Sequence, residues 1–167
     1  MNILNRELKA AIAMAFGHLV GVTCADNKLR PCKNDTISKY SRMVYDAFKS
    51  AKSHHEMVVS IMALRNTNLL SAIERLIPHV KSVPQAVRPY VIFALQFMAA
   101  ANRDKFLSVV MPIIHNTTEA TEIRMAAIST LFRAKPTALE LQELIAVALN
   151  ENNQEVLNFI LTTGRVS

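Results

Sequence analysis

Few residues of this chain have the type and spacing that chemistry needs, and the two cysteines are the first to consider. Cys24 and Cys32 enclose a polar, basic stretch, CADNKLRPCKNDT, which lies between two apolar segments. A protein metal site needs about four ligands, and a redox pair prefers the spacing C-x-x-C. Cysteines eight positions apart suit a disulfide that closes a short loop and adds about 2–3 kcal/mol. Two free, buried cysteines are the alternative, and spacing alone does not decide between them.

The other groups that could serve catalysis or cofactor binding are histidines and glycines. Phosphate-binding loops and nucleophile elbows need several glycines at fixed spacing, and the chain has only three. None of the five histidines has an evident partner that would orient its ring for proton transfer. The sequence therefore predicts no catalytic residue, no metal site and no cofactor, and it disfavours an enzyme.

Two asparagine sequons point to a different chemistry, N-glycosylation. Asn34 and Asn116 each begin an N-x-T motif, and both fall in predicted loops, where a glycan is tolerated. A chain with this content of Asn, Ser and Thr holds about one such motif by chance. The two asparagines are therefore glycosylation candidates chiefly because they lie in predicted loops, since the motif alone is weak support.

The charge of the chain is uneven. Its net charge is +6, yet residues 1–105 carry 15 Lys and Arg against 7 Asp and Glu, whereas residues 106–167 carry 4 against 6. A basic surface can attract nucleic acid, an anionic membrane or an acidic receptor, although a solvated helix face is the plainer interpretation. The basic residues of the stretch 26–52, called the basic patch below, are Lys28, Arg30, Lys33, Lys39, Arg42, Lys49 and Lys52.

The elements that must position these residues are helices, because apolar residues recur at helical spacing and strand signals are weak. One apolar stripe is formed by Ile37, Tyr40, Val44 and Phe48. Thr137 and Glu140 make a capping box. The sequence predicts an all-α chain of about nine helices, at residues 3–20, 36–51, 54–65, 69–80, 84–101, 104–114, 121–134, 138–150 and 154–163.

The first of these helices is predicted to face the core with Leu8, Ile12, Ala15 or Phe16, and Leu19, which recur at helical spacing. A membrane helix needs a run of about 18 apolar residues. The longest run that we find, VIFALQFMAAA, is shorter and contains Gln96. The sequence therefore predicts no segment that could cross a membrane.

The predicted helices repeat in pairs. Ile77-Pro78 recurs 34 residues later as Met111-Pro112. Helix pairs with a period of 31–36 residues are typical of an α-solenoid, in which each pair packs on the next, and a plain helical bundle is the alternative. Neither end has the polar cap of a terminal repeat, so we expect residues 1–167 to be a single segment of a longer superhelix.

The order of the sequence blocks resembles a known family. An "ALRN" helix, a "LIP" helix, a "VR…AL" helix, a "PI" helix and the run EIRMAAISTLFRAKPTALELQELIAVALN follow one another as in the helical domain of large lipid transfer proteins, most specifically over residues 56–160. This family includes vitellogenin, which fits best, apolipophorin, apolipoprotein B and the microsomal triglyceride transfer protein. The resemblance implies a right-handed, HEAT-like α-superhelix that supports a lipid cavity built of β-sheets.

The resemblance also implies a secreted protein of lipid transport and yolk storage, a nutrient reservoir and not an enzyme. The family carries a cysteine pair at this position, which implies a disulfide between Cys24 and Cys32. The barrel and the lipid-holding sheets of the family are not in this sequence, so lipid loading is not expected of this segment alone.

Two functions follow as hypotheses. The first is a structural segment that binds other domains of the parent lipid carrier and, through them, lipid. Such a segment should expose apolar surface, for which Val91, Leu95, Met98 and Ile113 are the candidates, and should tend to self-associate. The alternative is a HEAT-like binding module whose basic patch holds an anionic membrane, a receptor or nucleic acid. Nucleic acid is the least supported, because the patch has few aromatic residues for base stacking.

Overall fold

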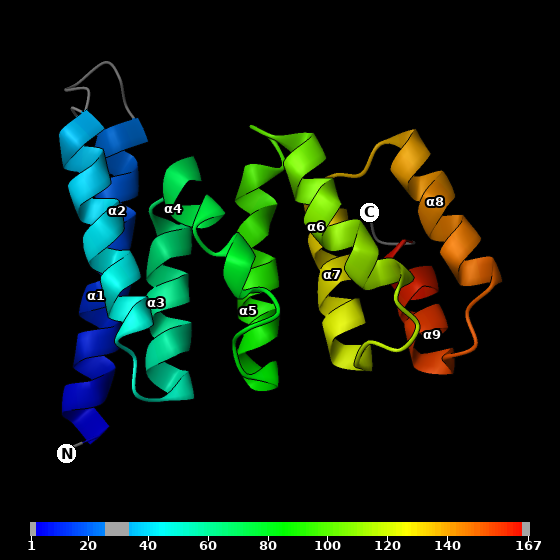
Figure 1. Ribbon diagram of the computed structural model, residues 1–167, viewed down its shortest axis with the longest axis horizontal. Coiled ribbons are helices and arrows are strands. Elements are labelled where there is room, and N and C mark those ends of the chain that lie inside the picture. Colours follow the sequence, from blue (N-terminus) through cyan, green and yellow to red (C-terminus); the bar gives the residue numbers. More distant parts are fainter. Residues whose placement is uncertain (1–2, 26–33, 165–167) are drawn as a thin grey trace. The chain divides into compact units, whose positions relative to one another are not determined.

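The computed structural model describes residues 3–25 and 34–164, and over these ranges the chain is all-α (Figure 1). The predicted fold class is confirmed there, since the described ranges hold nine α-helices, three 3₁₀-helices and no strand. The α-helices are α1 (Ile3–Ala25), α2 (Asn34–Lys49), α3 (His54–Asn66), α4 (Leu70–Glu74), α5 (Arg88–Ala94), α6 (Arg103–His115), α7 (Thr121–Arg133), α8 (Ala138–Leu149) and α9 (Gln154–Thr163). The 3₁₀-helices are η1 (Ile77–His79), η2 (Gln85–Val87) and η3 (Leu95–Met98).

Two of the predicted helices, at residues 69–80 and 84–101, are interrupted. The first becomes α4 followed by η1, with Pro78 in the first turn of η1. The second becomes η2, α5 and η3, with Pro89 in the first turn of α5. Proline has no backbone N–H to donate and fits best in the first turn of a helix. Each of these prolines therefore begins a new helical element.

The helices group into two compact units, Met1–Phe97 (unit 1) and Met98–Ser167 (unit 2). In unit 1, α3 is the central helix and packs against α1, α2 and α5. Its residues Ile61 and Leu64 are fully buried. The predicted apolar stripe of α2 is confirmed at Val44 and Phe48, which are also buried.

The apolar stripe predicted for the core side of α1 lies on its exposed side, so that prediction is wrong. Leu8, Ile12 and Leu19 are 58%, 59% and 62% exposed. The side that packs on α3 carries Gly17 and Gly21 instead. Because α1 is apolar on both sides, helical periodicity alone could not tell which side would meet the core.

The two glycines decide which side of α1 packs. A Cβ atom at Gly17 would lie 2.3 Å from the backbone oxygen of Ala63, and one at Gly21 would lie 2.7 Å from that of Asn66. No side chain larger than hydrogen fits at such distances without a backbone shift. The close approach of α1 to α3 therefore selects the glycine side and turns the larger apolar residues outward.

Within the described residues, α1 also holds one stretch that is long and apolar enough to cross a membrane by length and composition alone, Glu7–Cys24. The prediction that no segment reaches this length is wrong. It sought an uninterrupted apolar run, whereas this stretch is apolar on average and tolerates Glu7, Lys9 and His18. A helix that packs inside a protein can pass the same test, and α1 does pack along α3.

In unit 2, α7 is the central helix and packs against α6 and α9. Its residues Ile123, Ile128 and Leu131 are fully buried, as is Phe106 of α6. α8 contacts α9 more sparsely than α7 does. The core of this unit is therefore built on α6, α7 and α9.

The prediction that Val91, Leu95, Met98 and Ile113 form exposed apolar surface is wrong. Each of these residues is at most 4% exposed. Val91 lies on α5, which packs against α3, and Ile113 lies on α6, which packs against α7. Other large apolar residues are exposed instead. Those on α1, α8 and α9 are Leu8, Ile12, Leu19, Val22, Leu139, Leu141, Ile145, Leu149 and Leu161.

Candidate functional site

An apolar groove of about 470 Å³ lies between α8 and α9. Its lining residues follow one another at i, i+3, i+4, i+7 on both helices, so each helix turns a whole apolar face to the groove. Leu144 and Ile160 form a buried floor, whereas Ile145, Leu149 and Leu161 are more than half exposed. The lining, called the α8–α9 groove below, consists of Phe132, Leu141, Leu144, Ile145, Ala148, Leu149, Leu157, Ile160, Leu161 and Gly164.

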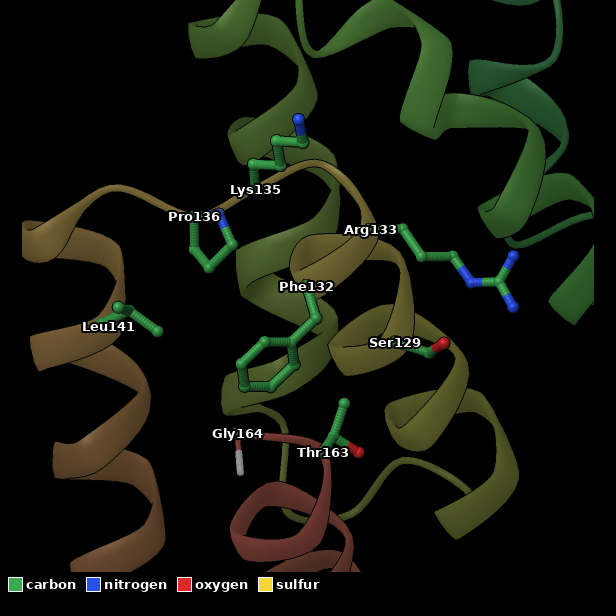
Figure 2. Close-up of a pocket in the computed structure, with 8 residues that line it drawn as sticks. All are labelled: Ser129, Phe132, Arg133, Lys135, Pro136, Leu141, Thr163 and Gly164. Atoms are coloured by element: carbon green, nitrogen blue, oxygen red, sulfur yellow. The ribbon is translucent and has the colours of Figure 1, made fainter. Parts of the chain in front are cut away.

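A second pocket, of about 750 Å³, adjoins this groove and shares Phe132, Leu141 and Gly164 with it. Figure 2 shows the ring of Phe132 near the centre, with Leu141 to its left and Gly164 below it, and the side chains of Arg133 and Lys135 extending away from the ring. Lys135 has a left-handed φ of 54° just after the end of α7, where helices commonly take this conformation. The pocket is therefore apolar at its centre and carries its charge at the rim.

An ion pair between Arg103 and Glu140 fixes the start of α8. Arg103 donates from Nε to Oε1 of Glu140 and from Nη1 to the carbonyl oxygen of Ala134, each at 2.8 Å. The carboxylate of Glu140 also accepts the backbone N–H of Thr137 at 2.8 Å, which completes the predicted capping box. One arginine at the start of α6 thus connects the end of α7 with the start of α8.

A second ion pair, between Arg124 and Glu151, lies deeper, with side chains 1% and 2% exposed. Arg124 donates from Nε and Nη2 to the carbonyl oxygen of Ile114, at 3.1 and 2.9 Å, and Nη2 also bonds Glu151. Glu151 accepts the backbone N–H of Asn153 at 2.8 Å. This pair therefore connects the last turn of α6, the first turns of α7 and the segment that leads into α9.

Hydrogen bonds from arginine keep both carboxyl groups ionised. The bond from Arg103 lowers the pKa of Glu140, and the bond from Arg124 lowers the pKa of Glu151, while burial acts in the opposite direction in each case. The bond to Glu140 likewise raises the pKa of Arg103. Neither pair belongs to the lining of the α8–α9 groove. Both pairs are therefore structural connections between helix ends.

In unit 1, the ring of His79 on η1 contacts two residues of α2 and one residue close to it in sequence. Its Nε2 lies 2.7 Å from Oη of Tyr45, and its Nδ1 lies 3.3 Å from Oγ of Ser82. The ring of Phe48 packs edge-on against it, with centroids 5.0 Å apart. Burial, and to a lesser degree Lys49, lowers the pKa of His79, which favours the neutral ring. This histidine therefore joins η1 to α2.

The structure describes one cysteine of the predicted disulfide. Cys24 is half-buried near the end of α1, and Cys32 lies outside the described residues. The pairing of the two therefore stays a prediction. Asn34, predicted in a loop, is the first residue of α2.

Asn116 lies in the connection between α6 and α7 and is exposed. Its Oδ1 accepts hydrogen bonds from the backbone N–H and from Oγ1 of Thr118, at 3.1 and 2.8 Å. The sequon is thus presented at the surface, as its predicted loop position requires. Glycosylation of Asn34 and Asn116 stays a prediction.

The basic patch is described in part. Lys28, Arg30 and Lys33 lie outside the described residues. The other four residues are exposed: Lys39, Arg42 and Lys49 on α2, and Lys52 after it. The three cations of α2 fall within about 80° of one another around the helix axis. The described part of the patch is therefore one face of a helix.

Comparison with models of protein families shows which family the chain belongs to. Residues 3–163 match the family model described as the vitellogenin TPR domain. The chain belongs to this family. The resemblance to the vitellogenin helical domain is therefore confirmed over most of the chain. Membership of this family also confirms the prediction that the chain is not an enzyme.

Individual vitellogenins show the same relationship at low identity. Vitellogenin-5 of Caenorhabditis elegans is 26% identical over 133 residues, which are 78% of this chain and 8% of that protein. Vitellogenin of Ichthyomyzon unicuspis is 28% identical over 178 residues, covering 98% of this chain and 9% of that protein. Vitellogenin-6 of Oscheius tipulae is 22% identical over 168 residues, covering 93% and 10%. The chain thus spans about a tenth of the length of these vitellogenins. No solved structure matches it.

Among residues 3–25 and 34–164, no three side chains of His, Cys, Asp or Glu are close enough to hold a metal ion. Two apolar surfaces, the α8–α9 groove and the exposed side of α1, were not predicted from the sequence. Leu141, Leu144 and Ile145 do have the helical spacing of one apolar face. Spacing cannot tell whether another element covers that face, and this is why the groove was missed.

Proposed function

We propose that this vitellogenin-type helical domain is a structural segment of a secreted protein of lipid transport and yolk storage. In that protein it would form a single segment of a right-handed α-superhelix that supports lipid-holding sheets built by other parts of the polypeptide. The observation that carries the proposal is the family match over residues 3–163. Relatives named vitellogenin that are about ten times longer agree with it.

The geometry favours support over lipid loading by this chain alone. The described ranges hold helices and no strand, so they supply no sheet to line a lipid cavity. The ion pairs of Arg103 and Arg124 fix helix ends on both sides of α7, which suits a brace that must keep its shape. The exposed side of α1 and the α8–α9 groove are apolar surfaces that other domains could cover.

Secretion is part of the proposal, and the cysteines offer a direct test of it. A disulfide between Cys24 and Cys32 forms and persists in an oxidising, secretory route. Titration of thiols on denatured, unreduced protein taken from the secreted fraction should find none. Two titratable thiols in carefully oxidised native material would contradict both the disulfide and the oxidising route.

Antibodies against residues 1–167 test the whole proposal. Applied to yolk and to circulating fluid of the source animal, they should detect a polypeptide many times larger than 18.6 kDa that floats with lipid in a density gradient. Removal of the lipid by extraction should shift the same antigen to the dense fractions. An antigen found only inside cells, or only in lipid-free fractions before extraction, would refute the proposal.

Binding of an anionic membrane through the basic patch is a second candidate, favoured by the shared, exposed face of Lys39, Arg42 and Lys49. Vesicles that contain phosphatidylserine should bind the chain less well as salt rises, because screening weakens surface attraction. The double variant Lys39→Glu/Arg42→Glu should lose this binding, whereas Lys81→Glu, at an exposed site outside the patch, should keep it. Equal binding by both variants would eliminate this candidate.

A further inference from the structure

Unit 1 contains a pocket of about 280 Å³ that is bounded by three of its helices. α3 lines one part of it, and α1 and the end of α2, which both pack on α3, line the rest. The lining residues fall within three short ranges, 9–10, 47–51 and 55–60, and the pocket is called the three-helix pocket below. The pocket therefore belongs to the interior of unit 1 and is separate from the α8–α9 groove.

Ser60 is buried in the lining of this pocket without a hydrogen-bond partner. It is 8% exposed, and its hydroxyl bonds no other residue in the described ranges of the chain. Thr130, also buried in a helix, donates instead to the carbonyl oxygen of Ala126 at 2.7 Å. A buried hydroxyl without a partner costs free energy, and alanine favours a helix more than serine does. The fold alone therefore gives no reason for a hydroxyl at this position.

Two cationic or neutral donors line the same pocket, Lys9 and His55. Both side chains are exposed, and neither makes a hydrogen bond or an ion pair with a residue that the structure describes. The carboxylate of Glu56 also lines the pocket, but it already accepts the backbone N–H of Lys52 at 2.7 Å. The available groups are thus donors, which suit a ligand that carries acceptor atoms and a negative charge.

Most of the remaining lining is small and apolar. It consists of Ala10, Ala47, Ala51 and Val59, together with Ser50, whose hydroxyl donates to the carbonyl oxygen of Asp46 at 2.8 Å. An inorganic anion would lose water against these methyl groups and gain nothing in return. The volume holds about nine groups of the size of water, at about 30 Å³ each. A carboxylic acid of about six carbons has this size, with an apolar chain for the alanines and an anionic group for the donors.

We propose that the three-helix pocket binds a short-chain monocarboxylate, whose hydrocarbon chain packs on the alanines and whose carboxylate accepts a hydrogen bond from Ser60 and faces the ammonium of Lys9. The inference goes beyond the proposed support function. A ligand in this pocket touches α1, α2 and α3 together, so it binds the folded unit 1 and not the unfolded chain. Binding should therefore raise the stability of unit 1 as the ligand concentration rises.

Nuclear magnetic resonance titration of the full chain with hexanoate tests the proposal. The amide signals of Ala10, Ala47 and Ser60 should shift and saturate, with a dissociation constant on the order of 1 mM for a ligand of about eight non-hydrogen atoms. Hexan-1-ol has the chain without the charge, and inorganic phosphate has the charge without the chain. Each should bind about tenfold more weakly or less. Equal binding of either, or hexanoate shifts centred on the α8–α9 groove, would overturn the proposal.

Two variants with matched controls test the named donors. Ser60→Ala should weaken hexanoate binding about three- to tenfold, and Lys9→Met about two- to fivefold. Ser71→Ala and Lys81→Met, at exposed sites outside the pocket, should bind like the parent chain. Without ligand, Ser60→Ala should unfold at the same urea concentration as the parent or a higher one, because it loses no hydrogen bond within the described residues. Unchanged binding in Ser60→Ala, or a loss of stability that shows its hydroxyl to serve the fold, would overturn the proposal.

Discussion

Units 1 and 2 hold their helices together by different means. In unit 1, α1 approaches α3 on the bare backbone of Gly17 and Gly21, and the contact depends on the absence of side chains. In unit 2, Arg103 and Arg124 reach across helix ends to the carboxylates of Glu140 and Glu151. The first contact responds to added volume and the second to lost charge, so the two units should fail under different perturbations.

Spectroscopy can follow the two units separately. The three tyrosines, Tyr40, Tyr45 and Tyr90, all lie in unit 1, and the chain has no tryptophan. Tyrosine fluorescence should therefore report unfolding of unit 1 alone, whereas far-ultraviolet circular dichroism reports helix loss in both units.

The largest expected effect is that of Arg124→Met in unit 2. The substitution leaves the carboxylate of Glu151, 2% exposed, buried without its cation, and it removes two hydrogen bonds to Ile114. Breaking a buried pair on one side costs about 3–5 kcal/mol. In urea unfolding, the circular dichroism transition should split or move to lower urea while the tyrosine transition stays in place.

The double variant Arg124→Met/Glu151→Leu is the control for charge. It removes both partners, and replacing a buried pair by apolar side chains is often nearly neutral. We expect most of the lost stability to return. If the single and double variants unfold at the same urea concentration, the unpaired charge is not the cause of the loss.

A smaller effect, confined to unit 1, is expected of Gly17→Ala. Alanine favours a helix over glycine by about 1 kcal/mol, but its Cβ atom would lie 2.3 Å from the backbone oxygen of Ala63. Forcing α1 away from α3 should cost about 1–3 kcal/mol net, seen as an earlier tyrosine transition. At Gly164 the nearest atom, the Ile160 oxygen, is 3.3 Å away, so Gly164→Ala should be close to neutral. An unchanged tyrosine transition in Gly17→Ala would mean that the close approach is not needed.

The smallest expected effects are two separate windows of pH dependence. The pKa values of Glu140 and Glu151 are lower in the folded chain than their ordinary value of 4.5, so unit 2 should lose stability as the pH falls below about 4.5. The pKa of His79 is also lower than its ordinary value of 6.5, so the unfolded chain takes up this proton first. Unit 1 should therefore lose a little stability as the pH falls through about 6.5.

Urea transitions measured from pH 8 to pH 3 check both windows. His79→Gln should remove the pH dependence of the tyrosine transition near pH 6.5. Glu140→Gln should weaken the acid dependence of the unfolding of unit 2, followed by circular dichroism. A tyrosine transition that responds only below pH 4.5 would show that His79 does not couple to folding. The units would then differ only in the glycine contact of unit 1 and the arginine ion pairs of unit 2.

Local chemistry let the sequence predict most of the helices. The Thr137–Glu140 capping box forms as predicted, because a hydroxyl and a carboxylate three residues apart can satisfy the first N–H groups of a helix by themselves. Helices α6 to α9 begin and end within one residue of the predicted bounds for the same reason. Where prolines follow closely, at Pro78 and Pro89, the prediction joined elements that proline separates.

Helical periodicity could not predict which side chains are buried and which are exposed. Leu8 and Leu19 have the spacing of a core stripe and are exposed, whereas Leu95 and Met98 were expected at the surface and are buried. A helix that is apolar on two sides gives no local signal for which side meets a neighbour. Arg124, with a charge, is among the most buried residues, because its partners, Ile114 and Glu151, are distant along the chain.

The amino-acid sequence by itself determined the all-α class, the helix caps and the family, since these depend on residues near one another in the chain or on their linear order. The tertiary structure decided which face of α1 is covered, where the α8–α9 groove lies and which arginines are buried with carboxylates. Each of these depends on how closely two backbones approach, as at Gly17 and Ala63. That distance is a property of helix pairs and not of any one helix.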